Sequence, residues 1–341
     1  MQDKEAIPMD PDSEVLHDFH PFVRQYKSGR VVRFATADII PAGTDTAGTG
    51  VSSRDVVINP TSGLWARLYL PPPPPAVSRD DAKLPVIVYY DGGAFVIGST
   101  ADRPTHEYLN SLAAGANALV VSVEYRRAPE HPLPAAHDDA WEGLEWVASH
   151  AAAAGEDGAG AEPWLAEHGD PSRVFLAGSS AGGNIAHHVA VRAGGGERGS
   201  LGVRVRGLLV IHPYFIGEAP VGMEAALDAA LKAWGDALWR FVCPGTPGPD
   251  DPLCNPFSEA AGGSAARVAA ERVLVCVAEK DLLRDRGVWY YENLKGSGYR
   301  GEVELHESAG EGHVFHYTNP GCEQARELQA RVLRFLHVEG V

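Results

Sequence analysis

Short apolar runs of strand length recur along the chain, with segments of helical periodicity between them. Six runs have the length and composition of buried strands: residues 86–90, 118–123, 174–177, 208–212, 273–278 and 302–306. Apolar positions at helical spacing predict helices over residues 136–150, 185–192 and 323–337. An earlier pair of runs, at residues 55–59 and 64–70, predicts an antiparallel hairpin at the edge of the sheet. This alternation indicates an α/β fold, in which a mostly parallel central sheet carries helices on both faces.

Two further segments do not follow this alternation, and we expect them to form a helical cap above the sheet. The first is at about residues 1–45, where four apolar positions have helical spacing: Val15, Phe19, Phe22 and Val23. The second is at about residues 214–265, where four more recur at helix-face intervals: Leu227, Leu231, Trp234 and Leu238. Core packing explains such a stripe more often than ligand contact does. The position of the second segment, after the fourth strand-like run, favours a pocket wall.

Two segments have the composition of connectors. Residues 71–75 are consecutive prolines, which cannot lie inside a strand or helix because proline lacks a main-chain N–H. Together with the polar residues up to Lys83 they predict an exposed, partly extended connector, and a ligand for a proline-binding module is the alternative. Residues 151–161 are rich in alanine and glycine and predict a surface insertion without chemistry of its own.

A serine stands between two glycines in the segment Ala-Gly-Ser-Ser-Ala-Gly-Gly-Asn at residues 177–184. The spacing is Gly-x-Ser-x-Gly around Ser180, between a strand-like run and a helical pattern. Gly178 and Gly182 lack the Cβ atoms that would collide in a sharp turn, so Ser180 is expected in a strained conformation at the positive end of a helix. With 38 glycines in the chain the bare motif arises readily by chance. The flanking strand and helix are what favour a nucleophile elbow.

A serine nucleophile needs a base and an acid that orients the base, and both follow in chain order. Asp281 comes just after the fifth strand-like run, and Asp285 is a close alternative in the same loop. His313 lies on a glycine-flanked turn after the sixth run. Taken singly, an acid or a histidine is usually an ordinary surface group. The order Ser, Asp, His, with each residue in a loop after a strand, predicts a catalytic triad of Ser180, Asp281 and His313.

The first buried strand runs into a pair of glycines, Gly92 and Gly93, which are followed by Ala94. Small residues at this point allow main-chain N–H groups to approach a substrate carbonyl. We therefore expect these three residues to form an oxyanion hole together with Ala181. Gly92 would supply the turn, and the N–H groups of the other three would donate. A simple turn at the end of a strand is the alternative.

Composition narrows the partners and the compartment. A formal net charge of −16 disfavours nucleic acid and anionic membrane surfaces as partners. Four cysteines show neither metal-ligand spacing nor a disulfide framework, which indicates a reducing compartment, although Cys243 and Cys254 flank a proline-rich loop where pairing is an alternative. The first residues carry no signal-peptide pattern, and no long apolar stretch is present. We therefore expect a soluble, cytoplasmic protein with one α/β domain over residues 1–341, whose 45% hydrophobic content suffices for one large core.

These motifs together resemble the hormone-sensitive-lipase-like group of α/β-hydrolases, and most closely plant carboxylesterases related to the gibberellin receptor. The resemblance covers the catalytic region almost from end to end. It is carried by the glycine loop after residue 90, the block at residues 123–136, the serine elbow, the Asn-Pro-Phe at residues 255–257, and the loops of Asp281 and His313. It implies an α/β-hydrolase fold with a cap.

Two positions depart from the pattern of that family. Asp91 stands where the family loop has histidine, and Ala94 stands where it usually has a third glycine. An ionised carboxylate beside an oxyanion hole would weaken the stabilisation of negative charge, unless it is turned away to accept hydrogen bonds from main-chain amides.

The leading function is a serine carboxylesterase for small carboxylic esters. Ser180 would attack the ester carbonyl, His313 would accept and return its proton, and Asp281 would fix the imidazole tautomer. This chemistry requires no metal and no organic cofactor. Five residues near the expected site are candidates for contact with the substrate: Phe95, Tyr214, Phe215, Trp234 and Val314.

Two other functions stay open on the same pocket. The first is a non-catalytic hormone receptor; receptors of this family have lost the catalytic histidine, so His313 disfavours it and Asp91 keeps it open. The second is a dehydratase acting on hydroxyisoflavanones, whose family members can carry threonine at the nucleophile position, so Ser180 favours hydrolysis.

Overall fold

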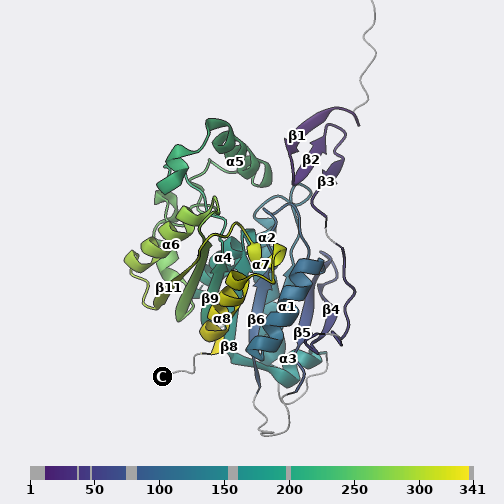
Figure 1. Ribbon diagram of the computed structural model, residues 1–341. Helices are drawn as coiled ribbons and strands as arrows, with labels where there is room; N and C mark the ends of the chain where they lie inside the picture. The colour runs from purple at the N-terminus through teal and green to yellow at the C-terminus, as the bar shows by residue number, and fades with distance from the viewer. Residues whose placement is uncertain are drawn as a thin grey trace, which may run out of the picture.

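A central sheet of eight strands lies between two layers of helices (Figure 1). The computed structural model describes residues 12–36, 38–46, 48–73, 83–152, 160–196 and 201–337. The strands of the sheet are β4 (Ser52–Asn59), β5 (Leu64–Leu70), β6 (Leu84–Tyr90), β7 (Leu119–Glu124), β8 (Gly169–Ser179), β9 (Val205–Ile211), β10 (Arg272–Ala278) and β11 (Glu302–Ser308). Their order is β11-β10-β9-β8-β6-β7-β5-β4. The predicted α/β fold and all six predicted core strands are therefore confirmed.

All strands from β11 to β7 in this order are parallel, whereas β5 pairs antiparallel with both β7 and β4. The predicted edge hairpin is thus confirmed. The parallel strands are covered on both faces, which is why they read as continuous apolar runs. Because β6 lies between β7 and β8, the loop after β6 is placed beside the loop after β8 at the same edge of the sheet.

The helices form two layers, each with its own core. On one face, α1 (Arg103–Ala116) and α8 (Glu323–His337) cover one set of buried strand side chains. On the other, α2 (Ala135–Ala152), α4 (Ala181–Gly194) and α6 (Arg284–Gly296) cover the alternate set. Short helices complete the set: α3 (Pro163–His168) and α7 (Phe315–Thr318), with 3₁₀ turns η1 (Gly222–Ala226), η2 (Glu259–Ala261) and η3 (Ser264–Arg267).

The sequence patterns predicted α2, α4 and α8 but not α1 or α6. In α6 the buried set includes Arg286 and Gly287 beside Tyr290 and Leu294, so an apolar stripe is nearly absent. Burial of that arginine depends on Glu224, which accepts from its Nε at 2.8 Å across a long sequence separation.

The N-terminal segment is a three-stranded antiparallel sheet, and the expected helix there was wrong. Its strands are β1 (Val15–Phe19), β2 (Val23–Tyr26) and β3 (Val31–Arg33). Phe19 and Val23 are a directly opposed pair across the turn, so their four-residue spacing is the closure of a hairpin and not one face of a helix. Pro21 within that turn would remove a hydrogen bond from a helix interior. This small sheet stands above the carboxyl ends of the parallel strands (Figure 1).

The second segment is helical, as expected, and its main element is α5 (Ala229–Val242). It stands opposite the N-terminal sheet at the same end of the molecule (Figure 1). The proline-rich connector lies outside the described residues beyond Pro73, and the insertion at 151–161 lies outside them at 153–159. All four cysteines are free, so Cys243 and Cys254 do not pair. Within the described ranges, no helix is both long and apolar enough to cross a membrane.

Candidate active site

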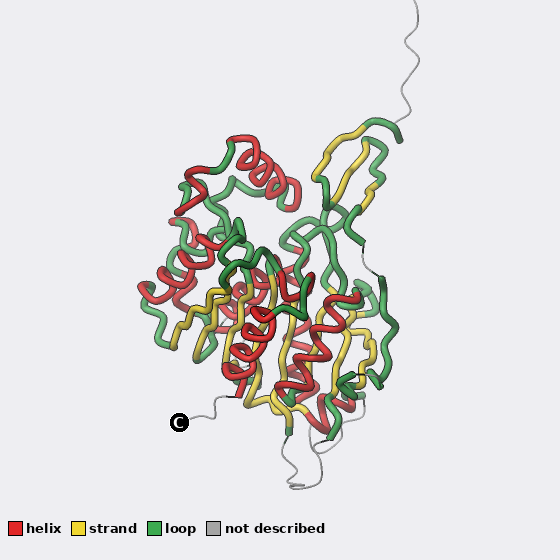
Figure 2. The backbone as a smooth tube through the Cα atoms, in the orientation of Figure 1, coloured by secondary structure: helices red, strands yellow, loops and turns green. Residues whose placement is uncertain are grey.

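The functional residues named from the sequence follow the carboxyl ends of neighbouring strands. Ser180 follows β8, Asp281 follows β10, and His313 lies in the loop between β11 and α7. Figure 2 shows these loops gathered at the upper edge of the sheet. Parallel strands bring such loops together at one edge, which is where ligands bind in open α/β sheets.

Ser180 occupies a sharp turn between β8 and α4. Its backbone has φ 55° and ψ −120°, a region that side chains other than glycine rarely adopt. Its N–H donates to the carbonyl of Ile211 at 2.8 Å, which ties the turn to the neighbouring strand. A Cβ atom added at Gly182 would lie 1.9 Å from the carbonyl oxygen of Tyr90, so only glycine fits there. The strained elbow expected from the sequence is what the chain forms.

The three side chains of the expected triad form one hydrogen-bonded chain. His313 Nδ1 lies 2.7 Å from Asp281 Oδ2, and His313 Nε2 lies 2.9 Å from Ser180 Oγ. An ionised carboxylate only accepts, so Nδ1 carries the proton and Nε2 accepts from the serine hydroxyl. The other carboxylate oxygen, Oδ1, accepts from the N–H of Leu283 at 2.9 Å, which fixes the orientation of the acid.

The alternative acid, Asp285, is engaged elsewhere. It accepts from the N–H of Met223 at 2.6 Å and from Arg284 Nη1 at 2.7 Å. Burial acts to raise the pKa of Asp285, but these donors outweigh it and hold that pKa below its ordinary value. Of the two acids that the sequence left in competition, the structure brings Asp281 to His313.

The neighbouring serine, Ser179, is fully buried and is not a rival nucleophile. Its hydroxyl lies 2.8 Å from that of Tyr89 and 3.5 Å from His316 Nε2. No group in the described part of the chain bonds to His316 Nδ1, so this second Ser-His pair lacks an orienting acid. Ser180 is partly accessible, at 6% exposure, and has a complete set of partners.

His212 is a site residue to which the sequence analysis assigned no role. It follows β9 with φ 48°, and its Nδ1 accepts from the N–H of Val314 at 3.0 Å. Burial, with the neighbouring histidines, lowers its pKa well below the ordinary value, so the ring stays neutral and can accept. His212 therefore positions the loop that carries His313. Its place directly after a core strand was the only signal in the sequence.

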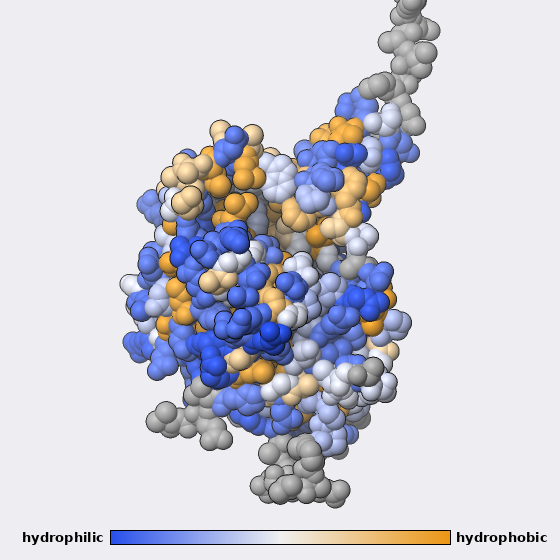
Figure 3. Space-filling view, viewed as in Figure 1, coloured by the Kyte–Doolittle hydropathy of each residue, from blue (hydrophilic) through white to orange (hydrophobic). Residues whose placement is uncertain are grey.

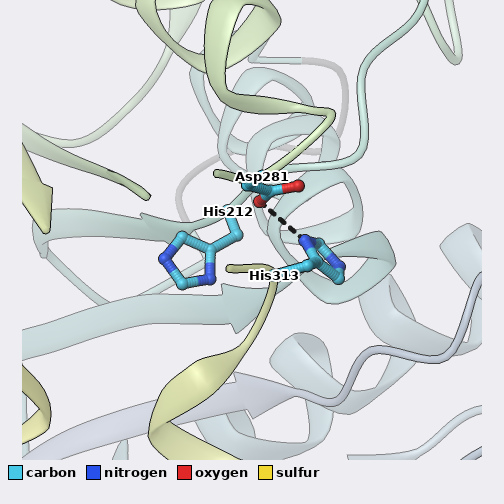
Figure 4. Close-up of side chains that lie close together, drawn as sticks. All are labelled: His212, Asp281 and His313. Carbon is cyan, nitrogen blue, oxygen red and sulfur yellow. Dashed lines mark hydrogen bonds and ion pairs between the residues drawn. The ribbon is translucent and has the colours of Figure 1, made fainter. Parts of the chain in front are cut away.

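Figure 4 shows three side chains that could be considered as metal ligands: His212, Asp281 and His313. Each offers one ligand atom, and these atoms lie within 4.8 Å of one another. Two of them are bonded to each other, as the dashed line marks, and His212 Nδ1 already accepts a main-chain hydrogen bond. His313 Nδ1 therefore carries a proton and His212 Nδ1 already accepts a hydrogen bond, so neither nitrogen offers a free lone pair to a cation. The arrangement fits a hydrogen-bonded triad better than a metal centre.

The expected oxyanion loop lies directly against the nucleophile. A Cβ atom added at Gly92 would lie 3.2 Å from Ser180 Cβ. Gly93 has φ 101°, and a Cβ atom there would lie 2.2 Å from the carbonyl oxygen of Ile97. No acceptor among the described residues takes a hydrogen bond from the N–H groups of Gly93, Ala94 or Ala181. The role of these three donors in an oxyanion hole stays a prediction.

Backbone strain is concentrated at this site. Six described residues other than glycine have positive φ, and five of them belong to the loops just discussed: Ala94, Phe95, Ser180, His212 and Val314. Such conformations cost about 1–3 kcal/mol each and persist where the surrounding structure enforces them. Their clustering supports a functional role for these loops.

The five expected substrate contacts separate into different environments. Phe95 packs edge-on against Tyr214, with ring centroids 5.8 Å apart, next to the oxyanion loop. Val314 is half-buried beside His313. Phe215 is fully buried and stacks on Tyr290 at 4.8 Å, so it belongs to the core between sheet and helices.

Trp234 lies in the upper part of the molecule, where α5 meets the N-terminal sheet. Its ring centroid is 6.0 Å from that of Phe19 and 5.9 Å from that of Phe22. Phe241 is seven residues further along α5, on the same face of the helix, and its ring centroid lies 4.9 Å from that of Phe19. Figure 3 shows a hollow between these two projections, with apolar side chains on both of its walls.

Comparison of the sequence with known proteins identifies a family and several similar plant enzymes. Residues 87–317, more than half of the chain, match the family described as alpha/beta hydrolase fold. Tuliposide A-converting enzyme 1, chloroplastic, of Tulipa gesneriana is 44% identical over 96% of this chain and 80% of its own length. The 2-hydroxyisoflavanone dehydratase of Glycyrrhiza echinata is 42% identical over 95% of this chain and 96% of its own length. Probable carboxylesterase 2 of Arabidopsis thaliana is 39% identical over 95% and 97%, respectively.

Solved structures of similar fold include esterases. The hyperthermophilic esterase of the archaeon Pyrobaculum calidifontis has a TM-score of 0.62 and 30% identity, covering 83% of this chain and 84% of its own. The thermostable carboxylesterase EstE1 has a TM-score of 0.63 and 28% identity, covering 88% and 92%. The chain belongs to the α/β-hydrolase-fold family and, within it, to the hormone-sensitive-lipase-like group that includes plant carboxylesterases.

Proposed function

We propose that this protein is a serine carboxylesterase that hydrolyses small carboxylic esters through an acyl-enzyme intermediate. The observation that carries the proposal is the continuous chain from Ser180 Oγ through His313 to Asp281, at 2.9 and 2.7 Å. A serine hydroxyl is a weak nucleophile until an adjacent base takes its proton, and this geometry supplies that base in the required tautomer.

Acylation follows from these positions. Ser180 Oγ attacks the carbonyl carbon while its proton passes to His313 Nε2, and Asp281 stabilises the imidazolium that forms. The carbonyl oxygen becomes an oxyanion and accepts from the unpaired N–H groups around the elbow. Collapse of this intermediate breaks the ester C–O bond, and the departing alcohol takes the proton from Nε2. Water then attacks the acyl-serine by the same steps and releases the acid.

We also propose that the two upper projections act as a cap, within about residues 1–45 and 214–265 of a single hydrolase domain. The support is a direct link from the N-terminal sheet to the loops below it. Arg33, on β3, donates from Nε to the carbonyl of Val96 at 2.6 Å and pairs with Glu130 at 2.6 Å. Val96 follows the oxyanion loop, so a shift of the N-terminal sheet would displace the main chain next to that loop.

Two alternative functions on the same fold would give different results in an activity assay. A hormone receptor on this scaffold would bind without turnover, and an intact triad argues against it. The similarity to a 2-hydroxyisoflavanone dehydratase keeps water elimination as the second candidate. The cytoplasmic location expected from the sequence stays a prediction, since two of the similar relatives are named chloroplastic.

The test is a panel of p-nitrophenyl esters with acyl chains from acetate to octanoate. Turnover that Ser180→Ala abolishes, with stoichiometric labelling of Ser180 by an organophosphate, supports the esterase. The matched control is Ser179→Ala, which should keep the elbow hydroxyl and its labelling. Absence of turnover from the folded wild-type protein would reject the proposal, and a 2-hydroxyisoflavanone assay on the same sample would then test the dehydratase.

A further inference from the structure

Asp91 occupies the position directly before the oxyanion loop, and its carboxylate is buried at 7% exposure. Oδ2 accepts from the hydroxyl of Thr105 at 3.1 Å, and Oδ1 accepts from the hydroxyl of Tyr317 at 3.4 Å. The N–H of Gly92 is a third donor. The side chain is thus directed towards the first turn of α1 and towards α7. It serves as the shared acceptor of three separate segments.

Two of these segments bear on the proposed chemistry. Gly92 begins the oxyanion turn, and α7, which carries Tyr317, starts two residues after His313. The hydroxyl of Tyr317 lies 2.5 Å from that of Tyr89, which in turn lies 2.8 Å from the hydroxyl of Ser179. One buried polar chain therefore joins the oxyanion turn, the loop after the base and the residue before the nucleophile.

We propose that Asp91 is a positioning residue whose ionised carboxylate holds the oxyanion turn and α7 in the arrangement that catalysis requires. The proposal rests on the proposed esterase function. An ionised carboxylate accepts at both oxygens, so it can satisfy three donors at once. Protonation turns one oxygen into a donor that faces another donor, and the remaining bonds become weaker because they lose their charge assistance.

The main chain at this point is held from the opposite side. The hydroxyl of Tyr125 donates to the carbonyl of Asp91 at 2.9 Å and to that of Gly92 at 3.0 Å. These bonds engage both carbonyl oxygens and so fix the orientation of the two peptide groups. The carboxylate and Tyr125 together fix the direction in which the following N–H groups point.

Ionisation of Asp91 lowers the stability of the folded state, because its carboxylate is buried. Burial raises its pKa to about 6, against hydrogen bonds from Gly92 and Thr105 and the charge of Arg127, which lower it, while Asp102 adds to the rise. The remaining polar neighbours, Tyr89, Tyr125 and Tyr317, are phenols whose own pKa values burial raises, so they stay neutral donors. A buried carboxylate that reduces stability at neutral pH is expected where function needs it.

The principal test compares Asp91→Asn with Ser180→Ala on a short-chain p-nitrophenyl ester. Asparagine keeps the shape and loses the charge, so kcat should fall about tenfold to a hundredfold while KM changes little, because the donors are displaced only from the transition state. The melting temperature of Asp91→Asn at pH 7 should equal or exceed that of the wild type. A loss of activity with gained stability is not what a merely structural residue gives.

The pH profile supplies a second readout. His313 must be unprotonated to act as a base, which gives log(kcat/KM) a limiting slope of one at low pH. If Asp91 must also be ionised, the wild-type slope approaches two, and Asp91→Asn returns it to one. Thr105→Val removes one donor and should move the acid limb to higher pH, whereas Thr105→Ser keeps the hydroxyl and should keep the wild-type limb.

Several results would overturn the proposal. An unchanged or raised kcat in Asp91→Asn would show that the carboxylate is neutral to, or opposes, oxyanion stabilisation. A wild-type slope of one would show that its ionisation is not required. If Ser180→Ala keeps its activity, the proposed function itself fails, whereas an inactive Ser180→Ala beside an unaffected Asp91→Asn removes only the role of Asp91.

Discussion

Substitution of the triad acid by its amide, Asp281→Asn, should remove activity by inverting the histidine tautomer. The Oδ1 position of Asp281 accepts from the N–H of Leu283 at 2.9 Å, so the amide oxygen of asparagine is held there. The amide NH₂ must then face His313 Nδ1, 2.7 Å away in the wild type. A donor at that position forces the imidazole proton onto Nε2. Nε2 can then no longer accept the proton of Ser180.

The expected loss is about 10³- to 10⁴-fold in kcat, the scale of this change in Ser-His-Asp triads. It corresponds to about 4 to 5.5 kcal/mol of transition-state stabilisation. KM should change little, because Asp281 is 7% exposed and lies behind the histidine. Folding should be retained, since the amide fills the same volume and keeps the bond to Leu283.

The assay is steady-state hydrolysis of p-nitrophenyl acetate and butyrate, with thermal unfolding as the check on structure. Asp285→Asn is the matched control, because this acid lies four residues further along and bonds to Met223 and Arg284. It should lose less than about tenfold. A benign Asp281→Asn beside a severe Asp285→Asn would refute the assignment of the acid. Equal, mild effects of both would refute the triad mechanism.

Three further outcomes are expected. Gly182→Ala should fail to form a native elbow, because its Cβ would lie 1.9 Å from a main-chain oxygen of β6, and circular dichroism with activity would detect this loss. The contribution of Asp91 to stability should fall by at most about 3 kcal/mol as pH rises from about 4 to 6, because its pKa is about 6 when folded and 3.8 ordinarily, so the native state binds the proton more tightly. Urea unfolding should therefore show the wild type losing stability relative to Asp91→Asn over this pH range. Trp234→Ala should raise KM for long-chain esters more than it lowers kcat, because it removes the ring 6.0 Å from Phe19. Leu231→Ala, at an exposed position of the same helix, should not, and equal KM values would exclude a cap role for the Trp234 contact.

The core strands and the elbow were predictable because their determinants are local. A parallel strand covered on both faces must be apolar throughout, and a strand-to-helix turn without room for Cβ atoms must contain glycine. Ser180, Asp281 and His313 follow from such patterns because parallel strands place successive loops at one edge. The sequence alone therefore determined the fold class and the nucleophile and base of the candidate triad, and it narrowed the acid to two residues.

The choices among near neighbours required the tertiary structure. The sequence favoured Asp281 but left Asp285 as a close alternative, and the direction of each side chain shows which one reaches His313. Phe215 was grouped with the pocket residues because it follows a core strand, yet it packs against Tyr290 in the core. Spacing along the chain does not specify which side of a loop a side chain takes.

The N-terminal sheet and the surroundings of Asp91 were decided by contacts between distant segments. Phe19 and Val23 have a spacing that fits a helix face or a hairpin closure equally, and pairing with β2 selects the hairpin. Asp91 meets partners 14 and 226 residues away in sequence, on α1 and α7. Local patterns fix the buried core strands, whereas long-range contacts decide the N-terminal sheet and which polar groups share a buried site, because strand partners, desolvation and hydrogen-bond partners exist only once the chain has folded.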